Sequence, residues 1–285
     1  MMASLRSMTN QFRKWSRSAR IWMVFLLFAI FVSVNFTESI RAFCQQYDVS
    51  CSIWLMPIAL TKLNHRLWIM LLPVLLFCDA PFLDEQQPFI IIRIGRIRWA
   101  IGQILYIFAA SALFYLICMA ISIALIAPHV EFTLEWGKVL KTLAQSRASF
   151  GADMDMIPKA VLESYSPLQA TVFCGGAVWL AVSFLGLLIF LCKLWMRREC
   201  GVILAGFFVG LSHFIELMGG VITKWCLLRF VSPVSWVNLE IVGKNMEESP
   251  SWKYVFAVGT ALNIVLVIGI LISVRHKSIE TVKTF

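Results

Sequence analysis

The fifth long apolar stretch of this chain, residues 201–223, contains two ionisable side chains, His213 and Glu216. They are three residues apart, so on a helix they share one face. Ionisable groups inside a bilayer are costly to bury and normally face a bundle interior or a wet cavity. Three interpretations follow: bonding between helices, the polar lining of a transport path, and catalysis. A catalytic or metal site needs further His or acidic partners in other spans, and Asp79 falls only at a membrane edge.

Other residue types with chemical potential give weaker signals. Asn263, in the last apolar stretch, is typical of an amide that links two helices. The eight cysteines include no CxxC pair and no Cys/His cluster, so the sequence predicts no metal site. Cys44 and Cys51 lie together in a polar segment, where they form either a disulfide or two free thiols.

Nucleotide-binding and hydrolase motifs are absent from the sequence. No GxxxxGK[ST] occurs, and the Gly-Gly pairs at 175–176 and 219–220 fall in apolar stretches without the required lysine. No GxSxG or HExxH occurs either. We therefore expect the chain to bind no cofactor and to hydrolyse no ATP by itself.

A short charged segment, residues 83–98, joins the second and third apolar stretches. An acidic start is followed by Pro88, the apolar patch 89–92 and an arginine cluster. We interpret it as a cytoplasmic elbow with a small helix at the membrane surface. The arginines either hold the elbow inside or help it to dock on a cytoplasmic protein. The charged residues of the elbow are Asp84, Glu85, Arg93, Arg96 and Arg98.

The composition defines the class of protein. The 285 residues are 60% hydrophobic and 14% charged, with a mean hydropathy of +0.80. A soluble protein is roughly half apolar and a quarter charged, so this chain is expected to span a membrane several times. The net charge of +9 comes from residues beside apolar stretches and not from a separate basic domain, so we expect no nucleic-acid partner.

The pattern predicts an all-α polytopic protein with six transmembrane helices and an amphipathic interfacial helix at residues 1–20. In that helix Leu5, Met8 and Phe12 share an apolar face with Trp15 and Ala19, opposite five basic residues. The outer loops are expected at 37–65, 128–167 and 224–252. The expected spans are 21–36, 67–82, 97–127, 168–192, 201–223 and 253–274.

The distribution of charge predicts the orientation. Lys and Arg concentrate in segments 1–20, 93–98, 193–198 and 275–285, whereas most acidic residues fall in the other loops. Cytoplasmic loops carry an excess of Lys and Arg, so both termini are expected in the cytoplasm.

The order of these elements resembles the permease subunit of type-2 ATP-binding-cassette exporters. The resemblance rests on the basic amphipathic start, six spans and the segment DEQQPFIIIRIGRIRWAIGQIL, which is similar to the coupling segment of that family. A broken outer segment with Ser232-Pro233-Val234-Ser235-Trp236 precedes the last span, as in the family. The long loop 128–167 departs from the compact members.

The resemblance implies a permease without its own motor, in the cytoplasmic membrane of a bacterium. Two permease subunits, alike or different, would pair, and each would dock a separate ATPase subunit that carries ATP and Mg. The elbow residues from Asp84 to Arg98 would make that contact. The family's substrates include drugs, peptides and lipids. The alternatives are an integral-membrane enzyme that uses His213 and Glu216, and a membrane anchor or sensor that transports nothing.

Overall fold

The structure, a computed structural model, describes residues 2–82, 87–145, 157–196, 199–219, 228–243 and 249–276. These residues are mostly helical, as expected for an all-α polytopic membrane protein. By length and composition, five helices within these ranges can cross a membrane. They are Ala19–Tyr47, Arg96–Ile126, Pro167–Trp195, Cys200–Met218 and Trp252–His276.

The helix found at the expected second span, 67–82, is shorter than the other membrane-spanning helices. It corresponds to α5 (Leu63–Phe77), which contains Pro73 and ends five residues before the expected boundary. Its 15 residues extend about 22 Å at 1.5 Å per residue, against a hydrocarbon core of roughly 30 Å. A single turn of helix, α4 (Met56–Ala59), comes before α5 in the chain, and residues 60–62 between them are not helical. Among the described residues, the structure therefore gives five long apolar helices and one short one.

The first span is longer than expected, and the loop predicted from residue 37 begins as helix. α2 (Ala19–Val32) continues through one π-helical turn (Ser33–Thr37) into α3 (Glu38–Tyr47). Polar residues suggested a loop here, but a buried stripe of Phe36, Ile40 and Phe43 continues at helical spacing. The stripe packs on the core and keeps the segment helical beyond the apolar stretch.

The remaining long helices agree with the sequence within a few residues. They are α7 (Arg96–Ile126), α10 (Pro167–Trp195), α11 (Cys200–Gly219) and α12 (Trp252–His276). Ser166 caps α10: its hydroxyl accepts a hydrogen bond from the Gln169 N–H, and the Gln169 side chain accepts one from the Ser166 N–H. Two short helices, α8 (Gly137–Gln145) and α9 (Lys159–Ser164), lie between α7 and α10.

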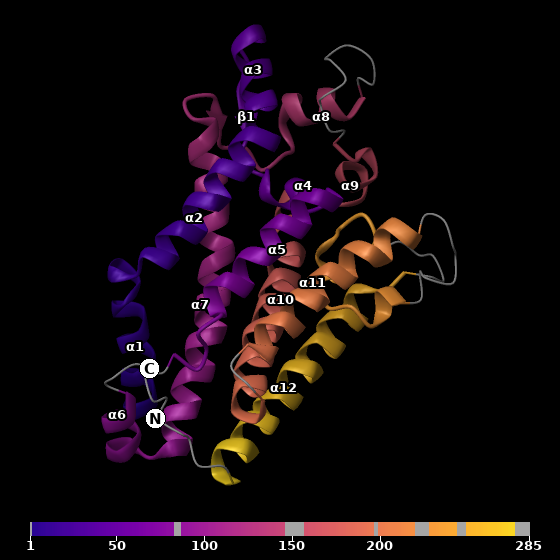
Figure 1. Ribbon diagram of the computed structural model, residues 1–285. Helices are drawn as coiled ribbons and strands as arrows, with labels where there is room; N and C mark the ends of the chain where they lie inside the picture. The colour runs from indigo at the N-terminus through magenta and orange to yellow at the C-terminus, as the bar shows by residue number, and fades with distance from the viewer. Residues whose placement is uncertain are drawn as a thin grey trace.

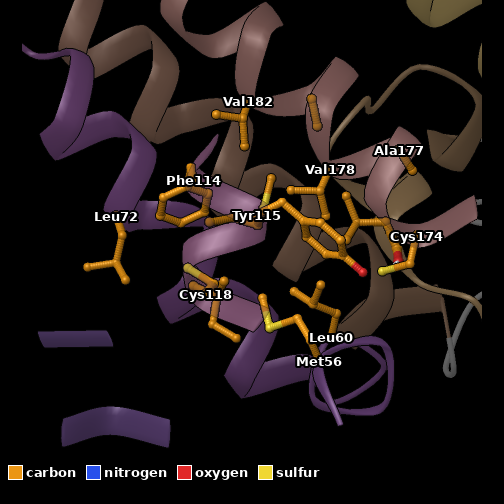
Figure 2. Packing of buried hydrophobic residues seen from close by; sticks show 14 of the residues in the cluster. Met56, Leu60, Leu72, Phe114, Tyr115, Cys118, Cys174, Ala177, Val178 and Val182 are labelled. Carbon is orange, nitrogen blue, oxygen red and sulfur yellow. Dashed lines mark hydrogen bonds between the residues drawn. The ribbon is translucent and has the colours of Figure 1, made fainter. Parts of the chain in front are cut away.

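α10 occupies the centre of the bundle and contacts α5, α7, α11 and α12. In its most apolar window 78% of the residues are buried, against 28% in the corresponding windows of α11 and α12. Figure 2 shows the ring of Tyr115 in α7 directed toward Cys174 of α10, with Met56 of α4 close by. The broken segment α4–α5 is therefore packed inside protein, where an irregular backbone at membrane depth is tolerated.

The expected outer segment 224–252 is described only at 228–243 and 249–252. Its central residues do not lie in lipid, because Val234, Trp236 and Leu239 are at most 2% exposed. A 3-10 turn, η4 (Ser235–Val237), contacts α10 and α11. Residues 228–243 therefore form a plug packed on the bundle and built on short turns.

The long helices run between two ends of the molecule (Figure 1). One end holds α1 (Met2–Arg13), α6 (Gln87–Ile94) and the last turns of α12. The opposite end holds α3, α8, α9 and a parallel strand pair, β1 (Cys51–Ser52) with β2 (Val130–Glu131). α6 of the elbow therefore lies at the end opposite α8 and α9 of the long loop.

Candidate functional site

A buried ion pair joins α5 to α11. The guanidinium of Arg66 contacts the carboxylate of Glu216, with side chains 1% and 9% exposed. Arg66 is among the largest fully buried side chains of the described residues. Moving two charges out of water costs several kcal/mol each, and their attraction compensates only when the pair is closely matched. Neither charge is therefore tolerable here without the other.

Some buried polar atoms around the ion pair have no hydrogen-bond partner in the part of the chain that the structure describes. Arg66 Nη1, Glu216 Oε1 and His213 Nδ1 are buried, and none has a hydrogen-bond partner among the described residues. No hydrogen bond or ion pair within those residues joins His213 to Glu216, although the two lie one turn apart on α11. Glu216 pairs with Arg66 on another helix, which agrees with bonding between helices, one of the three interpretations that the sequence left open.

His65 lies next to Arg66 and contacts a different neighbour. Its ring lies 5.5 Å from that of Phe31 in α2 and 5.8 Å from that of Phe36, both edge-on. Adjacent side chains of α5 thus link it to α2 on one side and to α11 on the other.

Sequence reasoning missed Arg66 because it precedes the apolar stretch that begins at Leu67, where a charge is typical of a loop. The signal that points to it is Glu216, because an acid inside a span calls for a cation at similar depth on another helix. Arg66 satisfies that requirement, since α5 begins three residues earlier, at Leu63.

Asn263 links α12 to α10. Its Nδ2 donates to the Leu180 carbonyl oxygen of α10 at 3.2 Å and to the Gly259 carbonyl oxygen of its own helix at 2.8 Å. Gly259 leaves room for this approach, because a Cβ there would lie 3.0 Å from Leu180. The contact is of the kind that holds helices together in a bilayer.

The elbow projects from the bundle as α6 and the turn into α7. Phe89 and Ile92 of α6 are 75% and 82% exposed, and Arg93, Arg96 and Arg98 are exposed as well. Gly95 separates the two helices at φ +86°, a conformation that side chains with a Cβ rarely adopt. Asp84 and Glu85, the expected acidic half of the coupling site, lie outside the described residues.

α1 packs against the first turns of α7, beside the elbow. Gln11 Nε2 donates to Gln103 Oε1 at 3.4 Å, and Trp15 Nε1 donates to the Tyr106 hydroxyl at 2.9 Å. The most buried residues at this contact are Ser4, Ser7 and Gln11, because small and polar residues allow a close approach. Of the expected apolar face, Met8, Phe12 and Trp15 are half-buried against the core, while Leu5 remains 42% exposed.

We expect Gly102→Val to separate α1 from α7. A Cβ at Gly102 would lie 2.7 Å from Ser7 Cβ and 2.9 Å from the Ser4 carbonyl oxygen, and neither atom can move away cheaply. Overpacking of this kind costs about 1–3 kcal/mol, so the melting temperature of the purified protein should fall by several degrees.

The control for that variant is Gly206→Val in α11, where nothing lies within 4 Å of the added Cβ. Both variants place the same residue inside a helix, so the difference between them isolates the contact with α1. Equal melting temperatures would contradict the close packing of α1 on α7.

Cys44 and Cys51 lie together at the end that carries β1. Both are fully buried and reduced in this structure, and their thiols are neighbours. The neighbouring Cys44 thiol and burial raise the pKa of the Cys51 thiol far above its usual range. No group of three or more His, Cys, Asp or Glu that could hold a metal occurs within the described ranges.

No protein-family model, curated protein or solved structure matches this chain. The features of the chain that bear on function are therefore its long apolar helices, the buried ion pair and the elbow.

Proposed function

We propose that the chain is the permease subunit of an ATP-driven exporter in the cytoplasmic membrane of a bacterium, with both termini and the elbow in the cytoplasm. The observation that carries the proposal is the position of α6. It lies at the end of the molecule opposite α8 and α9, with Phe89 and Ile92 exposed beside three exposed arginines. Exposed apolar residues rimmed by charge are typical of a protein interaction site.

The connection of α6 to the bundle favours a role in coupling. α6 is followed after one residue by α7, and α7 contacts α1, α10 and α12. α7 is 31 residues long, about 46 Å, and crosses from the elbow to the opposite end. A push on α6 is therefore transmitted along one helix to the outer segments, as rigid-body switching requires.

Two partners belong to the proposal. A separate ATPase subunit docks on the elbow and supplies ATP and Mg, and a second permease subunit, identical or related, completes the transport path. The substrate would be a drug, a peptide or a lipid-like molecule. The enzyme alternative is less well supported, because the carboxylate of Glu216 is held by Arg66 and is not presented to a substrate.

The test is co-purification. The tagged chain is purified in mild detergent from the cells that naturally produce it, and any co-purifying ATPase is identified and quantified by mass spectrometry. We expect Arg93→Glu with Arg96→Glu to reduce bound ATPase tenfold or more, roughly 1.4 kcal/mol, because charge reversal at an interface is unfavourable.

The matched control is Arg41→Glu with Lys138→Glu, which makes the same charge change at exposed positions of α3 and α8, at the opposite end. It should leave ATPase binding unchanged. The proposal fails if the unmodified chain retains no ATPase, and the elbow's role fails if both double variants bind equally. A chain that binds the ATPase but moves no substrate would be the anchor or sensor.

A further inference from the structure

Two cysteines that are seven residues apart in the sequence meet at the end of the molecule opposite the elbow. Cys44 is in the last turn of α3, and Cys51 begins β1. Asp48 between them adopts the left-handed conformation at φ +49° and closes the helix, with its N–H donating to the Cys44 carbonyl oxygen. This reversal brings the chain back so that Cys51 lies against the helix it has just left.

We propose that Cys44 and Cys51 form a disulfide bond in the protein as it exists in the membrane. Both side chains are fully buried, and the reversal at Asp48 makes the two thiols neighbours that interact with each other. The inference rests on the orientation in the proposed function, which places this end outside the cytoplasm. Disulfides persist in that compartment and are rare in the cytosol.

The chemistry is oxidation of two thiols by exchange. The thiolate of one cysteine attacks the disulfide of a thiol–disulfide oxidoreductase and forms a mixed disulfide with it. The thiolate of the second cysteine then attacks the first cysteine's sulfur and releases the oxidoreductase as a thiol. The two cysteines lose two protons and two electrons, and the oxidoreductase disulfide is reduced to two thiols. Because both cysteines are inaccessible in the folded chain, the exchange takes place during folding, before α3 packs on β1.

The bond would fix the first long helix to the outer segments. The Cys51 N–H donates to the His129 carbonyl oxygen at 2.9 Å, and Ser52 Oγ donates to the Trp136 carbonyl oxygen at 2.8 Å. β1 is thereby tied to the loop after α7 and to the start of α8. A covalent link from Cys51 to α3 joins α2–α3 to that loop.

The experiment counts thiols in the full-length protein. Membranes are isolated with N-ethylmaleimide to block free thiols and denatured. They are then reduced and treated with a polyethylene-glycol maleimide, which shifts the protein on a gel once for each newly reduced cysteine. We expect two shifts in the wild-type chain and none in Cys44→Ser or Cys51→Ser. Cys118→Ser, a buried cysteine of α7, keeps two. Reduction should also lower the melting temperature of the wild type by about 5 °C, and that of Cys44→Ser by much less.

Each other outcome overturns the inference. No shift in the wild type means that both thiols are free, and one or more shifts remaining in Cys44→Ser means another pairing. ATPase co-purification is measured on the same membranes, so the two proposals are separable. Bound ATPase without the disulfide removes only this inference, whereas a disulfide without bound ATPase removes only the proposed function.

Discussion

Replacing Glu216 with leucine should leave little folded protein in the membrane. Arg66 would then be a buried charge with no counter-ion, since its side chain is 1% exposed and Glu216 is its ion-pair partner. Removing one member of a buried pair costs about 3–5 kcal/mol, a large part of a typical total stability of 5–15 kcal/mol. Arg66→Met should be equally damaging, because it leaves the Glu216 carboxylate unpaired.

The double variant Arg66→Met, Glu216→Leu is the matched control. Both charges are gone, and replacement of a buried pair by apolar residues of similar volume is often neutral or stabilising. We expect the yield of monodisperse protein and its melting temperature to return close to wild type. Single variants that fold normally, or a double variant as poor as the singles, would contradict the ion pair.

The same double variant separates two roles of the pair. If Arg66 and Glu216 only hold α5 against α11, the folded double variant transports normally. If they line the transport path, it folds and binds its ATPase but transport is lost. Glu216→Gln, which keeps the shape and removes the charge, should lie between wild type and Glu216→Leu in stability.

Trp236→Ala should produce the second large loss of stability. Trp236 is 2% exposed, its Nε1 donates to the Arg229 carbonyl oxygen at 2.8 Å, and its ring lies edge-on to Tyr254 at 6.0 Å. Truncation of a buried tryptophan leaves a cavity and typically costs 3–5 kcal/mol. Loosening the plug 228–243 should also increase its cleavage by protease added to the outer side.

Trp22→Ala provides the comparison, because Trp22 is 65% exposed on the outside of α2. The same side chain is removed without creating an internal cavity, so the change in stability should be about 1 kcal/mol or less. Similar melting temperatures for the two variants would show that the segment around Trp236 is not packed as the structure describes.

The sequence predicted the elements whose signal is local. The apolar stretches that became α7, α10 and α12 were recognised within a few residues, because bilayer thickness demands long uninterrupted runs. The helix of the elbow was also predicted, from the apolar patch between Pro88 and Arg93. Its placement opposite the long loop follows from the alternation of spans.

What the sequence did not reveal depends on contacts between distant segments. Arg66 looked like a loop residue because no local pattern shows that α11 brings Glu216 to it. The plug residues around Trp236 were assigned to an outer loop, because no local pattern shows that they pack against α10 and α11. α3 was assigned to a loop because polar residues face away from a buried stripe that only the tertiary packing reveals.

α10 illustrates how different the surroundings of equally apolar helices can be. Its apolar character suggests a lipid neighbour, yet most of its surface is covered by α5, α7, α11 and α12. A systematic mutational scan should therefore give α10 the profile of a water-soluble protein's interior, where side-chain size is restricted. On α12, which is far less enclosed, tolerance to substitution should depend on side-chain hydrophobicity and not on side-chain volume. Changes in membrane thickness should accordingly act on the rim of the bundle first and reach its axis only through the surrounding helices.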